Sequence, residues 1–354
     1  MVDNLFIVES PLQALVAVEL GLQFKGQNNG VIYRLSGEGR ERNDDQICKV
    51  IDRGQWSFVR QVAFSASGAV AHHLSVRKFI LSLRKEFASS VQNVFFGEFR
   101  SQWMHFTRLA LAPEKCVLMD DGAATVTAKS EYIDKNVFFP RDLWISKSPS
   151  KDLVKNAIYM GLFDKKQLPR PLSFASAFLK HESEYKVDFS SVRKQFSTPN
   201  SLGVKEQAEV YFFGSKYSEA GILTLDYELG FISHVIDYYA QKGLTLIYCA
   251  HRDESSEKLD AIKSLGDVSV VRPELPAELF ILEHHENVAE IASAYSSVIN
   301  NLSLMFPDKP VTSFRLNSEA VNPLNRNQIE RIYKHYAAQG IVVAPVFPEL
   351  RIRL

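Results

Sequence analysis

Short apolar runs alternate with longer amphipathic stretches along this chain, and this alternation constrains the fold more than any other feature. In the first half, four apolar runs predict strands: NLFIV (4–8), GVIYRL (30–35), NVFFG (93–97) and KCVLMDDG (115–122). After the first run, SPLQALVAVELGLQF predicts a helix with Ser10 as its N-cap and Pro11 in the first helical position. The stretch 71–87 also has helical spacing.

The second half repeats the alternation. It predicts strands at 208–214, 244–251, 268–273, 296–301 and 311–316, and helices at about 225–242, 254–266 and 287–295. Strands that alternate with helices favour parallel sheets, so each half predicts one Rossmann-like α/β domain.

The pattern loosens between residues 140 and 208, where prolines and polar clusters interrupt it. We therefore expect an N-terminal acceptor-binding domain at 1–175 and a nucleotide-binding domain at 205–320. Residues 321–354 predict a C-terminal helix and tail that can cross back to the N-terminal domain.

Composition excludes some classes of function. The 354 residues carry 41 Lys plus Arg and 41 Asp plus Glu, whereas a nucleic-acid binder is normally clearly basic. The balance of charge over the whole chain does not exclude a local basic face that contacts a membrane surface. The three scattered cysteines indicate free thiols in a reducing compartment. No signal peptide or apolar run of about 20 residues is visible, so we expect a cytoplasmic protein, with any membrane contact peripheral, at the inner face of the inner membrane.

Unusual polar residues follow four predicted strands, and ligands of open parallel sheets bind beyond the carboxyl ends of the strands. The four groups are Asp120-Asp121-Gly122, Gly214-Ser215-Lys216, His251-Arg252 and Asn300-Asn301-Leu302-Ser303. The first group would form an acidic edge in one domain, and the other three would form a phosphate-binding edge in the second.

Each group also has an ordinary structural explanation. Asp-Asp-Gly is a common turn, and Gly214-Ser215 can be a tight turn as readily as an anion site. His251 can act on a phosphate or simply cap a helix. Glu278 can accept hydrogen bonds from a ribose or remain a solvated loop residue in a proline-rich turn.

Taken in order, ESPLQAL, DDG, FFGS, AHR and NNLSL resemble the motifs of bacterial sialyltransferases with the GT-B architecture. The most similar groups are glycosyltransferase family 52, the polysialyltransferases and the family 80 enzymes. The resemblance covers most of the chain, although its motifs are short. It implies two Rossmann-like domains whose parallel sheets face a central cleft.

The resemblance also implies roles for individual residues. Asp121, or alternatively Asp120, would be the general base, and Glu219 is a rival base. His251 would assist the departing phosphate. The donor-binding residues would be Gly214, Ser215, Lys216, Arg252, Glu278, Asn301 and Ser303.

One departure stands out, because Arg252 replaces the proline of the family's His-Pro motif. A guanidinium at this position matches the geometry of a donor carboxylate. We also expect repulsion between Asp120 and Asp121 to raise one carboxyl pKa and make a better base.

The implied reaction is an inverting transfer of a nonulosonic acid from its CMP-activated donor to a lipopolysaccharide or capsule glycan. Fixed N–H groups, hydroxyls and one imidazole can stabilise the departing CMP, so we expect neither a metal ion nor a cofactor. Two alternatives remain open: a non-hydrolysing UDP-sugar epimerase and a non-catalytic GT-B scaffold subunit.

Overall fold

The computed structural model describes residues 2–65, 67–87, 90–163, 170–197 and 208–347. Contacts divide the chain into two compact units, Met1–Val187 and Asp188–Leu354. Each unit contains one six-stranded sheet, and every strand pair in both sheets is parallel.

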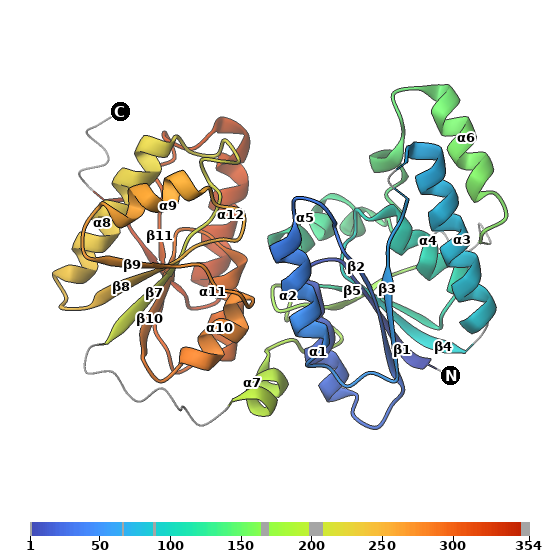
Figure 1. Cartoon of the computed structure of the whole chain (residues 1–354), viewed down its shortest axis with the longest axis horizontal. Helices are drawn as coiled ribbons and strands as arrows, with labels where there is room; N and C mark the ends of the chain where they lie inside the picture. The colour runs from blue at the N-terminus through green and yellow to red at the C-terminus, as the bar shows by residue number, and fades with distance from the viewer. Residues whose placement is uncertain (1, 66, 88–89, 164–169, 198–207, 348–354) are drawn as a thin grey trace. The chain divides into compact units, whose positions relative to one another are not determined.

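The first unit follows the βα alternation expected from the sequence. Its elements are β1 (Val2–Val8), α1 (Pro11–Gln23), β2 (Asn29–Arg34), α2 (Glu41–Ile51), β3 (Phe58–Val62), α3 (Ala69–Phe87), β4 (Val91–Phe96), α4 (Gln102–Leu111), β5 (Lys115–Met119), α5 (Ala123–Glu131), two short 3₁₀ helices η1 (Ile133–Lys135) and η2 (Arg141–Trp144), α6 (Pro149–Tyr159) and β6 (Ser173–Ala175). Figure 1 shows α1 and α2 on one face of this sheet and α3, α4 and α6 on the other.

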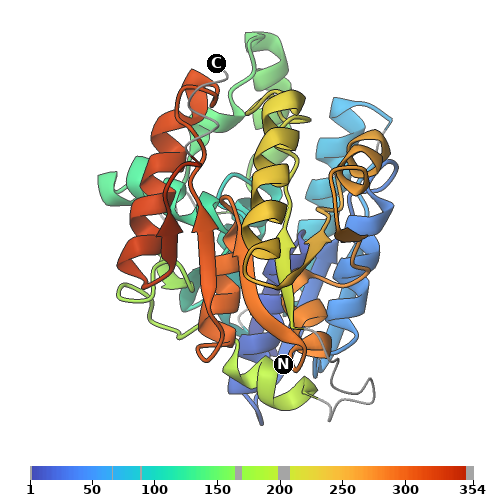
Figure 2. The same cartoon turned by 90° about the vertical axis from the view of Figure 1, so that its left-hand side faces the viewer.

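The second unit has the same plan. Its elements are α7 (Ser190–Phe196), β7 (Glu209–Phe213), α8 (Leu225–Ala240), β8 (Thr245–Cys249), α9 (Ser256–Lys263), β9 (Val268–Val271), α10 (Ala277–His284), β10 (Val288–Ser293), α11 (Ser297–Met305), β11 (Val311–Phe314), α12 (Pro323–Ala338) and β12 (Val342–Ala344). Figure 2 shows α8 (yellow) in front of these strands and α12 (red) beside the strand at the edge.

Both sheets have the doubly wound Rossmann order. The first runs β3-β2-β1-β4-β5-β6, and the second runs β9-β8-β7-β10-β11-β12. The central strands of the first sheet are buried on both faces, as Leu5, Phe6 and Ile7 show. The chain order reverses between β1 and β4 and between β7 and β10, and such switch points open a ligand crevice at the carboxyl ends of the strands.

The predicted start of α1 is confirmed. Ser10 is the N-cap, its side chain accepts a hydrogen bond from the amide of Gln13, and Pro11 is the first helical residue. This capping directs the chain from the end of β1 into α1, so Ser10 and Gln13 lie beside the switch point of the first sheet.

The predicted order of two elements near residue 290 is wrong. The sequence predicts a helix at 287–295 and a strand at 296–301, whereas the structure has strand β10 followed by helix α11. Both segments are largely apolar, so their periodicity does not separate a buried strand from a buried helix. Pairing of β10 with both β7 and β11 decides the matter, and Ser296 caps the helix that follows.

Residues from 321 to 344 belong to the second unit, where β12 pairs with β11. The domain limits expected from the sequence stay predictions, and the tail at 348–354 lies outside the described residues.

Candidate active site

Three carboxylates gather at the switch point of the first sheet. Glu9 follows β1, Glu98 follows β4, and Asp121 follows β5. Because β1, β4 and β5 are neighbours and parallel, their carboxyl ends meet at one edge. The sequence pointed to Asp121 alone.

Asp120 is turned into the protein, and only 1% of its surface is exposed. The hydroxyl of Ser176 and the backbone amide of Ala177 donate hydrogen bonds to its two carboxyl oxygens. Burial raises the pKa of Asp120 to about 7. Asp120 therefore ties the end of β5 to the loop after β6, and its carboxyl group is not accessible to a substrate.

Asp121 remains partly exposed. Its Oδ1 accepts hydrogen bonds from Gln13 Nε2 at 2.8 Å and from Ser10 Oγ at 3.5 Å, while its own amide donates to Thr125 Oγ1 at 2.8 Å. The carboxyl groups of Asp120 and Asp121 thus contact different partners, although the two residues are adjacent in sequence.

Burial raises the pKa of Asp121 to about 7, and the charge of Glu98 and a hydrogen bond with it contribute next. The expected cause was repulsion between Asp120 and Asp121, and this explanation is wrong, because the carboxylate that contacts Asp121 comes from another strand. A carboxyl pKa near 7 suits a general base at neutral pH.

Arg100 determines which of the two carboxyl groups, Glu98 or Asp121, is ionised first. Its guanidinium donates two hydrogen bonds to Glu98, at 2.8 and 3.0 Å. Burial alone would raise the pKa of Glu98, but the side chain and the backbone amide of Arg100, together with a hydrogen bond from Asp121, outweigh it and the net change is downward. Since Glu98 holds its negative charge more readily, the proton resides on Asp121.

Sequence reasoning missed Glu9, Gln13, Glu98, Arg100 and Trp103. Trp103 Nε1 donates to Glu9 Oε2 at 2.8 Å. Gln13 packs where a Cβ on Gly97 would be, 2.3 Å away, so the glycine leaves room for the side chain that holds Asp121. A signal was present for Glu98, because it follows a predicted strand just as the two aspartates follow an apolar run.

The carboxyl edge of the second sheet begins at Gly214, directly after β7. A Cβ at this position would lie 2.1 Å from the hydroxyl oxygen of Tyr248, so only glycine fits. Lys216 is exposed and pairs with Asp253 in the loop after β8, with 2.9 Å between Nζ and Oδ2. Ser215 lies between them and is partly exposed.

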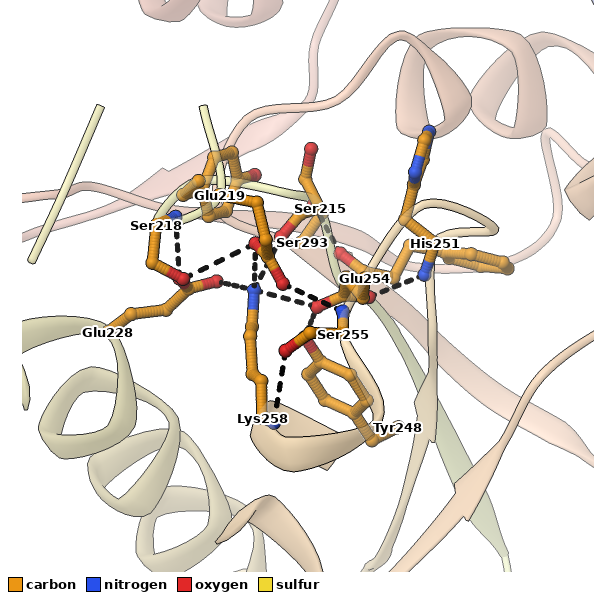
Figure 3. Close-up of polar contacts among 12 residues, drawn as sticks. Ser215, Ser218, Glu219, Glu228, Tyr248, His251, Glu254, Ser255, Lys258 and Ser293 are labelled. Atoms are coloured by element: carbon orange, nitrogen blue, oxygen red, sulfur yellow. Dashed lines mark hydrogen bonds and ion pairs between the residues drawn. The ribbon is translucent and has the colours of Figure 1, made fainter. Parts of the chain in front are cut away.

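A buried lysine holds this edge together (Figure 3). The ammonium group of Lys258 pairs with Glu228, with Glu254 at 2.8 Å and with Glu219 at 3.3 Å, and it donates to the carbonyl oxygen of Ser215 at 2.8 Å. These contacts connect α8, α9 and the loops that follow β7 and β8. We call this set, residues 215, 219, 228, 254 and 258, the Lys258 cluster.

The cluster contains more negative than positive charge. Burial raises the pKa of both Glu228 and Glu254. Burial would lower the pKa of Lys258, but the two glutamates outweigh it and the net change is upward. Lys258 therefore remains an ammonium ion, and its charge offsets part of the cost of burying the glutamates.

Glu219, the rival base, belongs to this cluster. Its Oε1 accepts a hydrogen bond from the amide of Ser255 at 2.9 Å. Partial burial would raise the pKa of Glu219, but backbone hydrogen bonds and Lys258 outweigh it and the net change is downward. A carboxylate held in this way is a weaker base than Asp121.

His251 follows β8, and its ring points away from the Lys258 cluster (Figure 3). Its backbone amide donates to Glu254, and its Nδ1 accepts a hydrogen bond from the amide of Asp253 at 3.1 Å. This acceptance assigns the ring proton to Nε2. Burial and the charge of Arg252 lower the pKa of His251 to about 4, so the ring is a neutral N–H donor at neutral pH.

Glu278, Asn301 and Ser303 lie on helices. Glu278 is in the first turn of α10 rather than in a turn before it, and it accepts a hydrogen bond from Asn301 Nδ2 at 2.8 Å, with both side chains buried. Burial raises the pKa of Glu278. Ser303 donates to the carbonyl oxygen of Asn300 within α11 at 2.8 Å. Residues 300–303 are thus not the end of a strand, and the N-terminus of α11 lies closer to the end of β10 than they do.

No three histidine, cysteine, aspartate or glutamate side chains in the described parts of the chain come together as metal ligands would. The expectation of a metal-independent reaction stays a prediction. Within the same residues, no helix is both long and apolar enough to cross a membrane.

Comparison with known proteins identifies relatives. A family model described as alpha-2,8-polysialyltransferase (POLYST) matches residues 4–315. No curated protein has a sequence that matches the chain significantly.

Among solved structures, the chain is similar to a putative UDP-N-acetylglucosamine 2-epimerase from Listeria monocytogenes, with a TM-score of 0.52 and 10% identity, over 96% of this chain and 89% of that one. It is also similar to UDP-GlcNAc 2-epimerase from Methanocaldococcus jannaschii, with a TM-score of 0.50 and 12% identity, over 94% and 92%. At this identity the similarity shows the fold alone, and that fold is GT-B, as expected.

Proposed function

We propose, since this chain belongs to the alpha-2,8-polysialyltransferase family, that it transfers a nonulosonic acid from a CMP-activated donor to a bacterial surface glycan. At the coarser level the family makes the chain a sialyltransferase-like glycosyltransferase, with a sugar nucleotide donor and a glycan acceptor. The identity of the nucleotide, inversion at the anomeric carbon and independence of metal belong to the proposal.

The observation that carries the proposal is Asp121. It is a partly exposed carboxyl group at the switch point of a sheet, and its pKa is raised to about 7. Near neutral pH a fraction of the protein molecules carry this group as a carboxylate, which can take the proton from the hydroxyl of the acceptor sugar. Attack by that hydroxyl, opposite to the departing CMP, forms the new glycosidic bond with inversion. CMP leaves with the bonding electron pair.

The second unit supplies groups suited to the departing phosphate. His251 offers a neutral Nε2–H, and the N-terminus of α11 follows β10. Such donors stabilise the charge that develops on the phosphate as the bond to the sugar breaks. In this role His251 donates a hydrogen bond, because its lowered pKa makes it a poor source of a full proton at neutral pH.

Glu278 remains our candidate for the ribose, and Arg252 remains our candidate for the sugar carboxylate. The amide of Asn301 occupies one oxygen of Glu278, which fixes the orientation of the carboxyl group. Arg252 is partly exposed beside His251, so it can reach a bound ligand.

The first experiment is calorimetry of the purified chain with CMP and with UDP. We expect CMP to bind and UDP to bind far more weakly. Preference for UDP would favour the epimerase alternative. The second experiment measures CMP release from CMP-sialic, CMP-legionaminic, CMP-pseudaminic and CMP-Kdo donors, with glycan acceptors present.

Variants separate catalysis from binding. We expect Asp121→Asn to abolish transfer and retain CMP affinity, and His251→Ala to lower both. Glu114→Gln is the control, because Glu114 is an exposed carboxylate of the same unit. Transfer that persists in Asp121→Asn but is lost in Glu219→Gln would assign the base to Glu219. Absence of CMP binding together with absence of transfer would overturn the proposal and favour the scaffold alternative.

A further inference from the structure

Exposed apolar side chains concentrate on one part of the first unit. Of the twelve large apolar side chains that are exposed in the described residues, eight lie on α3 or in the segment 141–160, which contains η2 and α6. These eight are Val70, Leu74, Leu81, Leu143, Ile145, Leu153, Val154 and Met160. Single exposed apolar residues are ordinary, but a concentration of this kind marks an interaction surface.

Helix α3 mixes apolar and basic side chains on its solvent-exposed face. Val70, Leu74, Lys78, Leu81 and Lys85 follow one another at intervals of three or four residues, and all five are exposed. This spacing places them along one stripe of the helix. The opposite face, which includes Ile80 and Leu83 among its residues, packs into the core.

Helix α6 packs beside α3 and extends this surface (Figure 1). Arg77 of α3 donates hydrogen bonds to the carbonyl oxygens of Ile158 and Met160, so the end of α6 lies next to the α3 stripe. Met160 is 74% exposed and Leu153, two turns earlier, is 71% exposed. A hollow of about 560 Å³ is lined in part by Val70 of α3 and Val154 of α6.

The same surface is basic in a chain without net charge. Residues 69–87 and 141–160 contain eight Lys and Arg side chains against three Asp and Glu. Two of the three acids are paired, because Glu86 contacts Arg60 at 2.8 Å and Asp152 contacts Lys155 at 2.7 Å. Six of the eight basic side chains are exposed: Lys78, Arg84, Lys85, Arg141, Lys147 and Lys151.

We propose that this α3–α6 surface docks the protein on an anionic lipid bilayer. Protruding apolar side chains would enter the boundary between head groups and acyl chains, while the lysines remain among the lipid phosphates. A second copy of the chain is a poorer occupant, since a two-fold interface would bring basic patch against basic patch. A soluble polyanion would contact the lysines but would not account for the exposed leucines.

The test is sedimentation of the full chain with phosphatidylcholine vesicles and with vesicles of equal parts phosphatidylcholine and phosphatidylglycerol. We expect binding to the anionic vesicles, and we expect it to weaken with salt. Lys78→Gln with Lys85→Gln should weaken it about 30-fold, because each basic side chain near an anionic surface contributes about fivefold. Leu74→Gln with Leu153→Gln should weaken it by about tenfold or more.

Matched controls lie elsewhere on the molecule. Leu324 is 90% exposed in the second unit, and Lys25 is exposed at the end of α1. Leu324→Gln and Lys25→Gln should bind as the unchanged chain does. Binding unaffected by the α3–α6 variants, or no binding at all, would overturn the proposal. So would a dimer in light scattering that only the leucine variants dissociate. These results do not depend on transfer activity, so they leave the proposed function untouched.

Discussion

Replacement of Glu98 by glutamine should change the pH dependence of transfer, because Glu98 helps to hold the proton on Asp121. The Asp121 pKa of about 7 lies some three units above the 3.8 of an ordinary aspartate, on the order of 4 kcal/mol against ionisation. Burial is the largest cause and Glu98 the next. Both the charge of Glu98 and its hydrogen bond contribute, and we take their joint share as on the order of one pKa unit.

The assay is kcat/KM for the CMP-sugar donor between pH 5 and pH 9, normalised to the alkaline plateau. For the unchanged enzyme we expect an acid limb near pH 7, because transfer needs Asp121 ionised. In Glu98→Gln the limb should move down by about one pH unit, which at pH 6 raises the ionised fraction of Asp121 about fivefold. The plateau itself should fall modestly, since a carboxylate of lower pKa is a weaker base.

Two further variants sharpen the assay. Arg100 lowers the pKa of Asp121, so Arg100→Gln should move the limb upward, opposite to Glu98→Gln. Glu114→Gln should leave it unchanged. A limb that stays in place in Glu98→Gln would refute the coupling of the two carboxylates, and a limb near pH 4 in the unchanged enzyme would refute Asp121 as the titrating base.

Three other predictions concern the second unit. Lys258→Met should destabilise the protein by about 3–5 kcal/mol in urea denaturation, because it leaves buried glutamates without their cation; a loss below about 1 kcal/mol would contradict this. Gly214→Ala should weaken CMP binding in calorimetry, since the new methyl group collides with Tyr248. Gly266→Ala is the control and should not weaken it, because the nearest atom to a Cβ there is 3.5 Å away, an ordinary contact distance. The ring of His251 should stay neutral above about pH 5 in the free protein and gain basicity when CMP binds, as nuclear magnetic resonance of its ring nitrogens can show. Titration of the free ring near pH 6.5 would argue against this environment.

The strands were the easiest part of the fold to predict, because parallel strands buried on both faces appear as unbroken apolar runs that end at glycine or polar residues. The same property caused the error at β10 and α11, since a short buried helix has the same appearance. Pairing with β7 and β11 separates the two, and a single sequence does not display strand pairing.

The candidate site was predictable where one chain segment carries the chemistry. Asp121 and His251 each follow a recognisable strand, so each could be found from its own neighbours. Glu98 also follows a predicted strand, but its importance, like that of Lys258, comes from partners on other elements that its own neighbours in the sequence do not reveal. Glu98 meets Asp121 only because β4 lies beside β5, and Lys258 meets Glu228 only because α9 packs on α8.

The hydrogen bond between Ser176 and Asp120 has a consequence for interpreting the effects of substitutions in this protein. A hydroxyl 56 positions along the chain holds the residue next to the candidate base, so the loop after β6 sets where Asp121 can reach. Substitutions in that loop should therefore impair turnover while leaving donor affinity intact. In a screen for loss of activity they would resemble changes to the reactive carboxylate itself.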